Sequence, residues 1–141
     1  NLLSLSRYEN TASRMDSIQY TYDNGAMGAA ANSNRLTKAE DVTTASLNGR
    51  GDLEGVHQYT YDAIGNLTRE VGKERVNISG SGMALCNATT SIEWTVYGKI
   101  KKVDKTLVDP ASPSFIHKER INFTYDASGN RVKKEYWKDI H

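Results

Sequence analysis

One six-residue segment recurs four times along the chain, and this repeat constrains the fold more than any other feature of the sequence. The copies are residues 18–23 (IQYTYD), 57–62 (HQYTYD), 92–97 (IEWTVY) and 121–126 (INFTYD), each with threonine at its fourth position. Alternation of large apolar and polar residues places the large side chains on one face of a β-strand. The repeat therefore predicts an all-β protein built from recurring strands.

Two of the copies continue into the same turn signal, which predicts β-hairpins. Residues 62–66 (DAIGN) and 126–130 (DASGN) each place an aspartate three residues before a glycine. The aspartate can accept a hydrogen bond from the backbone two residues along, and the glycine supplies the positive φ of a following bulge. The return strands would be residues 67–71 and 131–137. The third copy predicts a tighter hairpin around Gly98.

A single hairpin of this kind would not be stable alone, because its few buried side chains do not offset the entropy of ordering the chain. Hairpins laid side by side share ladder hydrogen bonds and pack their aromatic rows across neighbouring strands. We therefore expect consecutive antiparallel hairpins in one curved or spiralling sheet. Such a sheet is open at its edges, which offers a route to self-association.

Composition limits the core and the partners of this sheet. Hydrophobic residues make up 38% of the chain and eight residues are tyrosine, so we expect a largely aromatic core arranged in layers. A net charge of +1 gives no overall field that would recruit nucleic acid or an anionic membrane. No apolar run approaches the roughly 20 residues that span a bilayer, so we expect no membrane insertion. Cys86 is the single cysteine, which excludes an internal disulfide.

The spacing between copies varies, which divides the chain into constant hairpins and variable linkers. Residues 1–17 form a lead-in of unassigned structure, and the repeat region covers residues 18–141. The predicted loops are residues 24–34, 39–55, 72–91 and 105–116. Because the chain starts without methionine and ends soon after a predicted strand, we expect it to be part of a longer protein.

No group of residues has the spacing that catalysis, a cofactor or a metal ion requires. An EF-hand calcium loop needs several oxygen ligands and a terminal glutamate, which the turns at Asp62 and Asp126 lack. The histidines are scattered, and the carboxylates do not occur in the facing pairs that glycosidases use. Turn geometry already accounts for the aspartates, glycines and asparagines. We therefore predict a non-enzymatic protein that uses no cofactor.

The return strands at residues 99–105 and 131–138 are rich in lysine. Outward lysine side chains discourage edge-to-edge aggregation of strands, which is their ordinary role. A nucleic-acid site would need exposed aromatic rings among these cations. Because the aromatic rings are expected on the opposite, buried face, we predict no nucleic-acid binding. Residues 50–52 match the RGD tripeptide that integrins bind, but so short a match arises easily by chance.

The two complete copies resemble the YD repeat of bacterial RHS (rearrangement hotspot) proteins. They are residues 59–67 (YTYDAIGNL) and 123–132 (FTYDASGNRV), and related repeats occur in the shell of insecticidal toxin complexes and in animal teneurins. The resemblance runs from residue 18 to residue 137 with gaps at the linkers. Residues 94–100 (WTVYGKI) are similar to the degenerate repeat that often precedes the end of an RHS shell. The positions assigned to the repeat are Tyr20, Tyr22, Asp23, Tyr59, Tyr61, Asp62, Gly65, Asn66, Trp94, Tyr97, Gly98, Phe123, Tyr125, Asp126, Gly129 and Asn130.

This resemblance implies a wall segment of a hollow β-shell that encloses a C-terminal toxin in a secreted or cell-surface protein. The partners would be the remaining repeats of the shell and the enclosed effector. One departure limits the comparison: residues 109–112 (DPAS) lack the glycine of the Asp-Pro-x-Gly signature at which such shells cleave themselves. We therefore expect neither the self-cleaving core nor the toxin within this chain.

The alternative function is a cell-surface adhesin module that binds carbohydrate. Rows of tyrosine and tryptophan on an open sheet offer flat surfaces on which sugar rings could stack. No copy of the repeat adds the cluster of polar groups that would orient a sugar in a specific pocket.

Overall fold

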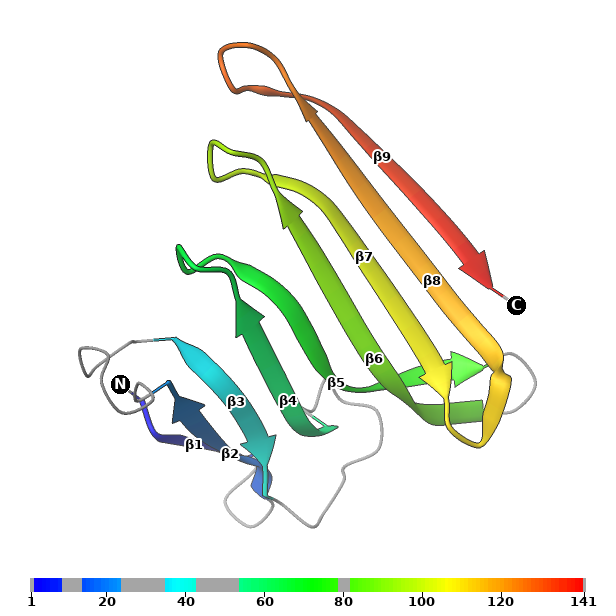
Figure 1. The fold of residues 1–141 in the computed structure, drawn as a ribbon. Helices are drawn as coiled ribbons and strands as arrows, with labels where there is room; N and C mark the ends of the chain where they lie inside the picture. Colours follow the sequence, from blue (N-terminus) through cyan, green and yellow to red (C-terminus); the bar gives the residue numbers. More distant parts are fainter. Residues whose placement is uncertain (1, 9–13, 24–34, 43–53, 79–81, 141) are drawn as a thin grey trace.

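The computed structural model describes residues 2–8, 14–23, 35–42, 54–78 and 82–140, and nine strands within them form one antiparallel sheet (Figure 1). Each strand pairs with its neighbours in chain order, so the sheet is a meander. It is open, because β1 and β9 lie at its two edges. The predicted all-β class is confirmed. The strands are β1 (Ser4–Tyr8), β2 (Arg14–Tyr22), β3 (Leu36–Asp41), β4 (Glu54–Tyr61), β5 (Leu67–Ile78), β6 (Gly82–Trp94), β7 (Ile100–Asp109), β8 (Ser112–Tyr125) and β9 (Arg131–Ile140).

The turn between β4 and β5 has the predicted chemistry. The Gly65 amide donates to the Asp62 carbonyl at 3.1 Å, and Gly65 has a φ of +95°. One carboxylate oxygen of Asp62 accepts from the amides of Ile64 at 3.1 Å and Asn66 at 2.8 Å. Burial raises the pKa of this carboxyl, but its hydrogen bonds outweigh that effect and lower the pKa. The hairpin over residues 126–130 repeats this geometry.

The third hairpin corrects the alignment of the repeat. The Thr95 amide donates to the Lys99 carbonyl at 2.7 Å, and the Gly98 amide donates to the Thr95 carbonyl at 3.0 Å. The loop therefore spans as many residues as the other two, and the predicted tighter turn is wrong. Thr95 takes the place of Asp62, and its hydroxyl accepts from the Lys99 amide at 3.1 Å. Tyr97 lies in the turn, 86% exposed, and is not a strand residue of the repeat.

Two segments predicted as loops are strands. β5 and β6 pair continuously to Ile78 and Gly82, and they occupy most of residues 72–91. β7 and β8 occupy most of residues 105–116, joined by a turn in which the Asp109 carboxylate accepts from the Ala111 amide at 2.9 Å. Local sequence does not show how far these strands run, because pairing with a neighbouring strand decides strand length more than local propensity does.

The structure describes the predicted lead-in and the two remaining predicted loops only in part. The lead-in contains β1 and the start of β2, which pair with each other. Of the predicted loop over residues 39–55, residues 39–41 belong to β3 and residues 54–55 to β4. The predicted loop over residues 24–34 and the RGD tripeptide at residues 50–52 lie outside the described residues.

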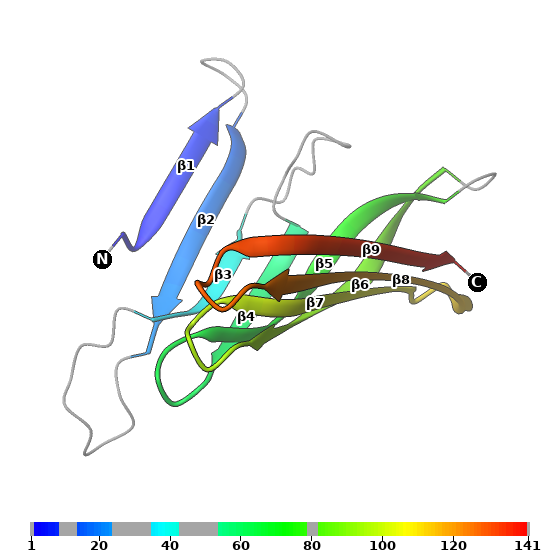
Figure 2. The same cartoon turned by 90° about the horizontal axis from the view of Figure 1, so that it is seen from above.

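The buried interior is small and aliphatic, so the prediction of a largely aromatic core is wrong. Cys86 is fully buried beside Ala88 and Leu107, and Val76, Ala84 and Phe115 pack against them partly buried. The aromatic residues of the repeat strands are only half-buried. Figure 2 shows the reason: the described strands form one twisted sheet, without a second layer that would cover the rings.

One close approach within the sheet requires a glycine. The His57 imidazole lies against Gly72 on the neighbouring strand, and a Cβ at Gly72 would be 2.4 Å from His57 Nδ1. The same Nδ1 is hydrogen-bonded to Glu70 Oε1 at 3.0 Å. The missing side chain at Gly72 therefore lets the imidazole lie flat on the sheet and reach its carboxylate.

We expect Gly72→Ala to lower the free energy of unfolding by about 1–3 kcal/mol, the usual cost of overpacking. Urea denaturation of the wild type, each single variant and the double variant with His57→Ala would measure it. In the His57→Ala background the alanine should cost far less, because nothing then occupies its space. An equal cost in both backgrounds would show that His57 does not impose the glycine.

Candidate functional site

The strand register places the repeat aromatics on one face of the sheet, which we call the aromatic face. Its defining residues are Tyr22, Tyr61, Trp94 and Tyr125, the last residues of β2, β4, β6 and β8. Each lies at a register shift against the first residue of the strand that follows. Such a shift is a β-bulge or a similar irregularity, and it disrupts the ladder locally.

Each defining aromatic residue donates a hydrogen bond to a backbone carbonyl at or just before the start of the strand that precedes its own hairpin. Tyr61 Oη donates to the Leu36 carbonyl at 2.8 Å, and Leu36 is the first residue of β3. We call this contact the junction hydrogen bond. The others run from Tyr22 to Leu2 at 2.9 Å, from Trp94 Nε1 to Leu67 at 2.7 Å, and from Tyr125 to Ile100 at 2.8 Å.

The junction hydrogen bond bridges a gap in the backbone ladder. Within a hairpin, pairing continues to the last residue before the turn, as between Tyr61 and Leu67. Between hairpins it stops two residues inside the return strand and three residues before the end of the next outgoing strand, so the tips of the second, third and fourth hairpins stand apart in Figure 1. The side chain supplies the donor that no facing backbone provides, and an unpaired carbonyl would otherwise cost free energy. The last pairs before the tips are Lys38–Gln58, Arg69–Ser91 and Lys102–Asn122.

Sequence reasoning assigned these rings to packing and missed their role as donors. A usable signal was present: the last residue of each outgoing strand is tyrosine or tryptophan, whereas Phe123 lies two residues before such a position. A phenolic O–H and an indole N–H can both donate, but phenylalanine cannot. The junction therefore needs a large ring with a donor at its far end.

The other predicted repeat positions divide between the aromatic face and the turns. The aromatic face also holds the residues two positions before the junction donors of β2, β4 and β8, which are Tyr20, Tyr59 and Phe123. The Asp23 amide donates to the Arg35 carbonyl at 2.9 Å, as the Asp62 amide does to its own partner across the turn. The first hairpin is therefore closed in the same way, whatever the length of its loop.

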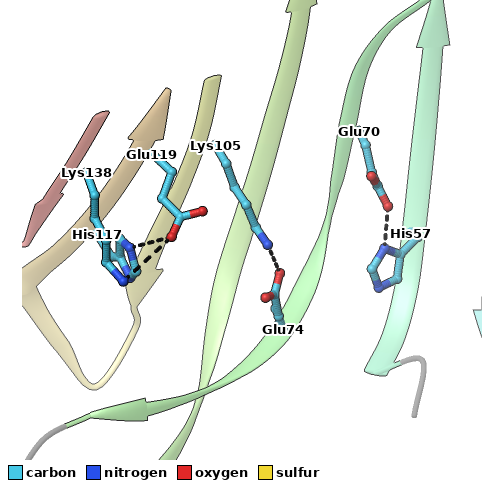
Figure 3. Close-up of polar contacts among 7 residues, drawn as sticks. All are labelled: His57, Glu70, Glu74, Lys105, His117, Glu119 and Lys138. Atoms are coloured by element: carbon cyan, nitrogen blue, oxygen red, sulfur yellow. Dashed lines mark hydrogen bonds and ion pairs between the residues drawn. The ribbon is translucent and has the colours of Figure 1, made fainter. Parts of the chain in front are cut away.

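A row of alternating charges crosses the aromatic face deeper in the sheet. Glu70, Thr90, Lys105, Glu119 and Lys138 are directly paired from β5 to β9. Lys138 Nζ lies 3.8 Å from Glu119 Oε1, and His117 Nε2 lies 3.0 Å from the same oxygen (Figure 3). We call these residues, with His57, Glu74 and His117, the charged row. Lysines 105 and 138 therefore share a face with the aromatic rings, which corrects the prediction that they point away from them.

The Lys105 side chain crosses a whole strand to contact its carboxylate partner. Its Nζ lies 2.5 Å from Glu74 Oε2, although the two residues are on β7 and β5 with β6 between them (Figure 3). On β6 the intervening positions of this face are held by Cys86 and Ala88, which pair with Glu74 and Gly72. Their small side chains leave room for the lysine to cross.

The contacts of the charged row favour the ionised carboxylates. The hydrogen bond with His57 lowers the pKa of Glu70, and nearby Lys105 adds to that effect against the opposing effect of burial. Burial raises the pKa of Glu119, but the hydrogen bond from Tyr136 and the neighbouring His117 and Lys138 outweigh it. Both carboxyl groups therefore have a lowered pKa.

The described contacts of the charged row are mainly hydrogen bonds and ion pairs among its own side chains. Among the described residues, no group of three or more His, Cys, Asp or Glu side chains is placed to hold a metal ion. Burial raises the pKa of the Cys86 thiol, which disfavours the reactive thiolate. The described part of the chain contains no helix of the length and apolarity needed to cross a bilayer.

In comparisons with models of known protein families and with curated proteins, the chain matches none. Two arrangements of the described residues bear on its function: the junction hydrogen bonds, which join the hairpins, and the charged row, which connects their strands.

We expect Tyr61→Phe to lower the free energy of unfolding by about 0.5–1.5 kcal/mol, because the Leu36 carbonyl loses its donor. Tyr97→Phe is the matched control, since that residue is 86% exposed in a turn. Urea denaturation followed by circular dichroism would compare the two. Equal effects would refute a special role for the junction hydrogen bond.

The lowered pKa of Glu70 makes stability depend on pH in a defined direction. Because its folded pKa lies below the ordinary value of 4.5, ionised Glu70 stabilises the fold above that pH. The contribution is lost as the pH falls through the folded pKa. Glu70→Gln should therefore flatten the loss of stability in acid, measured by urea denaturation at neutral and acidic pH. Glu135→Gln, on an exposed residue of β9, is the control and should leave the acid dependence nearly unchanged.

Proposed function

We propose that this chain is a non-enzymatic structural segment of an RHS/YD-repeat protein. It would form part of the wall of a β-shell that encloses a C-terminal toxin in the parent protein. The observation that carries the proposal is the junction hydrogen bond. It joins every outgoing repeat strand to the strand before it through the same donor position, so hairpins can be added in one direction by one rule.

The two edges of the sheet support this role. At one edge, Leu2 accepts a hydrogen bond from Tyr22, as the first residues of β3, β5 and β7 do from later hairpins. At the other edge, Arg131 is the first residue of β9 and holds the equivalent position. A further hairpin of the parent protein could therefore use the same junction. The remaining repeats are the partners that this geometry favours.

Protease protection in the parent protein tests the proposal. Deletion of one repeat unit, residues 95–125, keeps the order of outgoing and return strands but shortens the wall. We expect the region that follows the chain to become sensitive to protease in the deletion variant and to stay protected in the wild type. Ser128→Ala, on an exposed turn residue, is the control. Equal sensitivity of that region in the wild type would contradict an enclosing wall.

Carbohydrate binding is the second candidate, favoured by a hollow between the third and fourth hairpin tips. Tyr97, Lys99, Lys101, Phe123 and Tyr125 line it together with hydroxyl-bearing residues. A glycan array with the wild type and Tyr97→Ala would test it. Reproducible binding that Tyr97→Ala abolishes, with the circular dichroism spectrum unchanged, would show an adhesin function rather than a purely structural one.

A further inference from the structure

The most exposed large apolar side chains of the described residues stand at two neighbouring hairpin tips. Val96 is 93% exposed, Tyr97 86% and Ile64 84%. Ile64 and Tyr97 occupy equivalent positions in turns of the same geometry, and these turns lie at the same end of the strands (Figure 1). Turn geometry does not require an apolar side chain there, because the equivalent residue of the fourth turn is Ser128. The fold therefore does not explain why these three exposed positions carry large apolar side chains.

Cations without a carboxylate partner among the described residues lie at the third and fourth hairpin tips. Lys99 lies over the Tyr125 ring at 5.4 Å, and Arg131 lies over the Phe123 ring at 5.3 Å. Together with Lys101 they form no ion pair within the described part of the chain, unlike the lysines of the charged row. Lys99 and Lys101 also line the hollow between the third and fourth tips.

The one carboxylate that lines that hollow, Asp126, forms no ion pair with these cations. Asp126 uses its carboxylate to accept hydrogen bonds from Asn130 in its own turn, at 2.8 Å from the amide and 3.2 Å from the side chain. Lys99 also donates to the Gly129 carbonyl, but this contact does not cancel its charge, so the positive charge at the third and fourth tips can attract an outside anion. The tip surface, as we name it, consists of Ile64, Val96, Tyr97, Lys99, Lys101 and Arg131.

We propose that the tip surface docks on a bilayer that contains anionic lipids. Val96 and Tyr97 would enter the interface, with Ile64 beside them, while Lys99 and Lys101 face the headgroups. Apolar side chains flanked by lysines bind such surfaces through buried apolar area together with attraction to anionic headgroups. Tyrosine is also well suited to the boundary between lipid and water.

The shape of the tip surface favours a bilayer over a protein partner. Its apolar side chains stand on two tips, Ile64 on one and Val96 with Tyr97 on the next, and adjacent hairpins lie about 10 Å apart, or two strand spacings. A fluid interface can receive separate points of insertion, whereas a protein interface needs a continuous, closely packed core. Figure 1 shows the turns of successive hairpins in a row at one end of the strands, which matches the first arrangement.

The rings of the hollow argue against single-stranded nucleic acid. Such ligands need a series of free aromatic faces on which successive bases stack. Phe123 and Tyr125 already have Arg131 and Lys99 over their rings, which leaves Tyr97 as the free ring of the hollow. Val96 would also contribute nothing to a ligand bound through charge alone.

Cosedimentation of the chain with vesicles tests the proposal. We expect binding to vesicles of phosphatidylcholine with phosphatidylglycerol, weak binding to phosphatidylcholine alone, and a loss of binding at high salt. The double variant Val96→Ser, Tyr97→Ser should lose most of the binding. Lys101→Ala should weaken it roughly fivefold, the contribution of one lysine near an anionic surface.

Two variants away from the tip surface serve as controls. Met83→Ser removes a side chain that is 53% exposed at the other end of the hairpins, and Lys73→Ala removes an exposed lysine of β5. Both should bind vesicles as the wild type does, and circular dichroism would check that all variants fold. The absence of vesicle binding by the wild type, or equal binding to neutral vesicles, would overturn the proposal.

A soluble polyanion distinguishes the remaining alternative. Poly-glutamate should compete only weakly, because it offers no apolar interface for Val96 and Tyr97. If poly-glutamate displaces the vesicles fully and the double serine variant binds as well as the wild type, the surface responds to charge alone. That result would indicate an acidic protein partner and would also overturn the proposal.

Discussion

The architecture depends on the hydrogen bond that the last residue of each outgoing strand, a tyrosine or tryptophan, donates to a backbone carbonyl at the start of the preceding strand. This hydrogen bond exists because the ladder between hairpins ends before the tips while the ladder within each hairpin continues. The local turn prepares it: Asp62 and Gly65 close the loop, the register shifts at the strand end, and the ring of the next hairpin bridges the gap. Local chemistry and assembly of the sheet are thus coupled through one side chain per repeat.

The charged row connects the strands farther from the turns than the junction hydrogen bonds do. A single-layer sheet buries little apolar surface, and the few buried side chains cluster around Cys86. Outside that cluster, ion pairs and hydrogen bonds between charged side chains connect neighbouring strands of the single layer. Exposed ion pairs contribute little individually, but a half-buried row with alternating signs disfavours any register that would bring like charges together.

Much of this fold could be predicted because its signals are local. The aspartate and glycine of residues 62–66 determine the turn within a few residues, so the hairpins followed from the sequence. The third repeat was misaligned because Thr95 resembles the strand threonine of the other copies, although its hydroxyl acts here as the turn acceptor. The lengths of β5 to β8 were missed because they depend on partners far along the chain. The charged row was missed for the same reason: Glu70 and Lys105 become neighbours on one face only when the register of three strands is known.

The contact between Lys105 and Glu74 has a mechanical consequence. It joins β5 to β7 across β6, so it resists sliding of either strand along the one between them. Backbone ladders alone tolerate such sliding in steps of two residues, because each step restores the hydrogen bonds and the faces. The ion pair between β5 and β7 opposes such a step, since the step would move the cation away from its carboxylate. The small side chains of β6 therefore do more than fill a core: they leave room for an ion pair that opposes sliding of the strands.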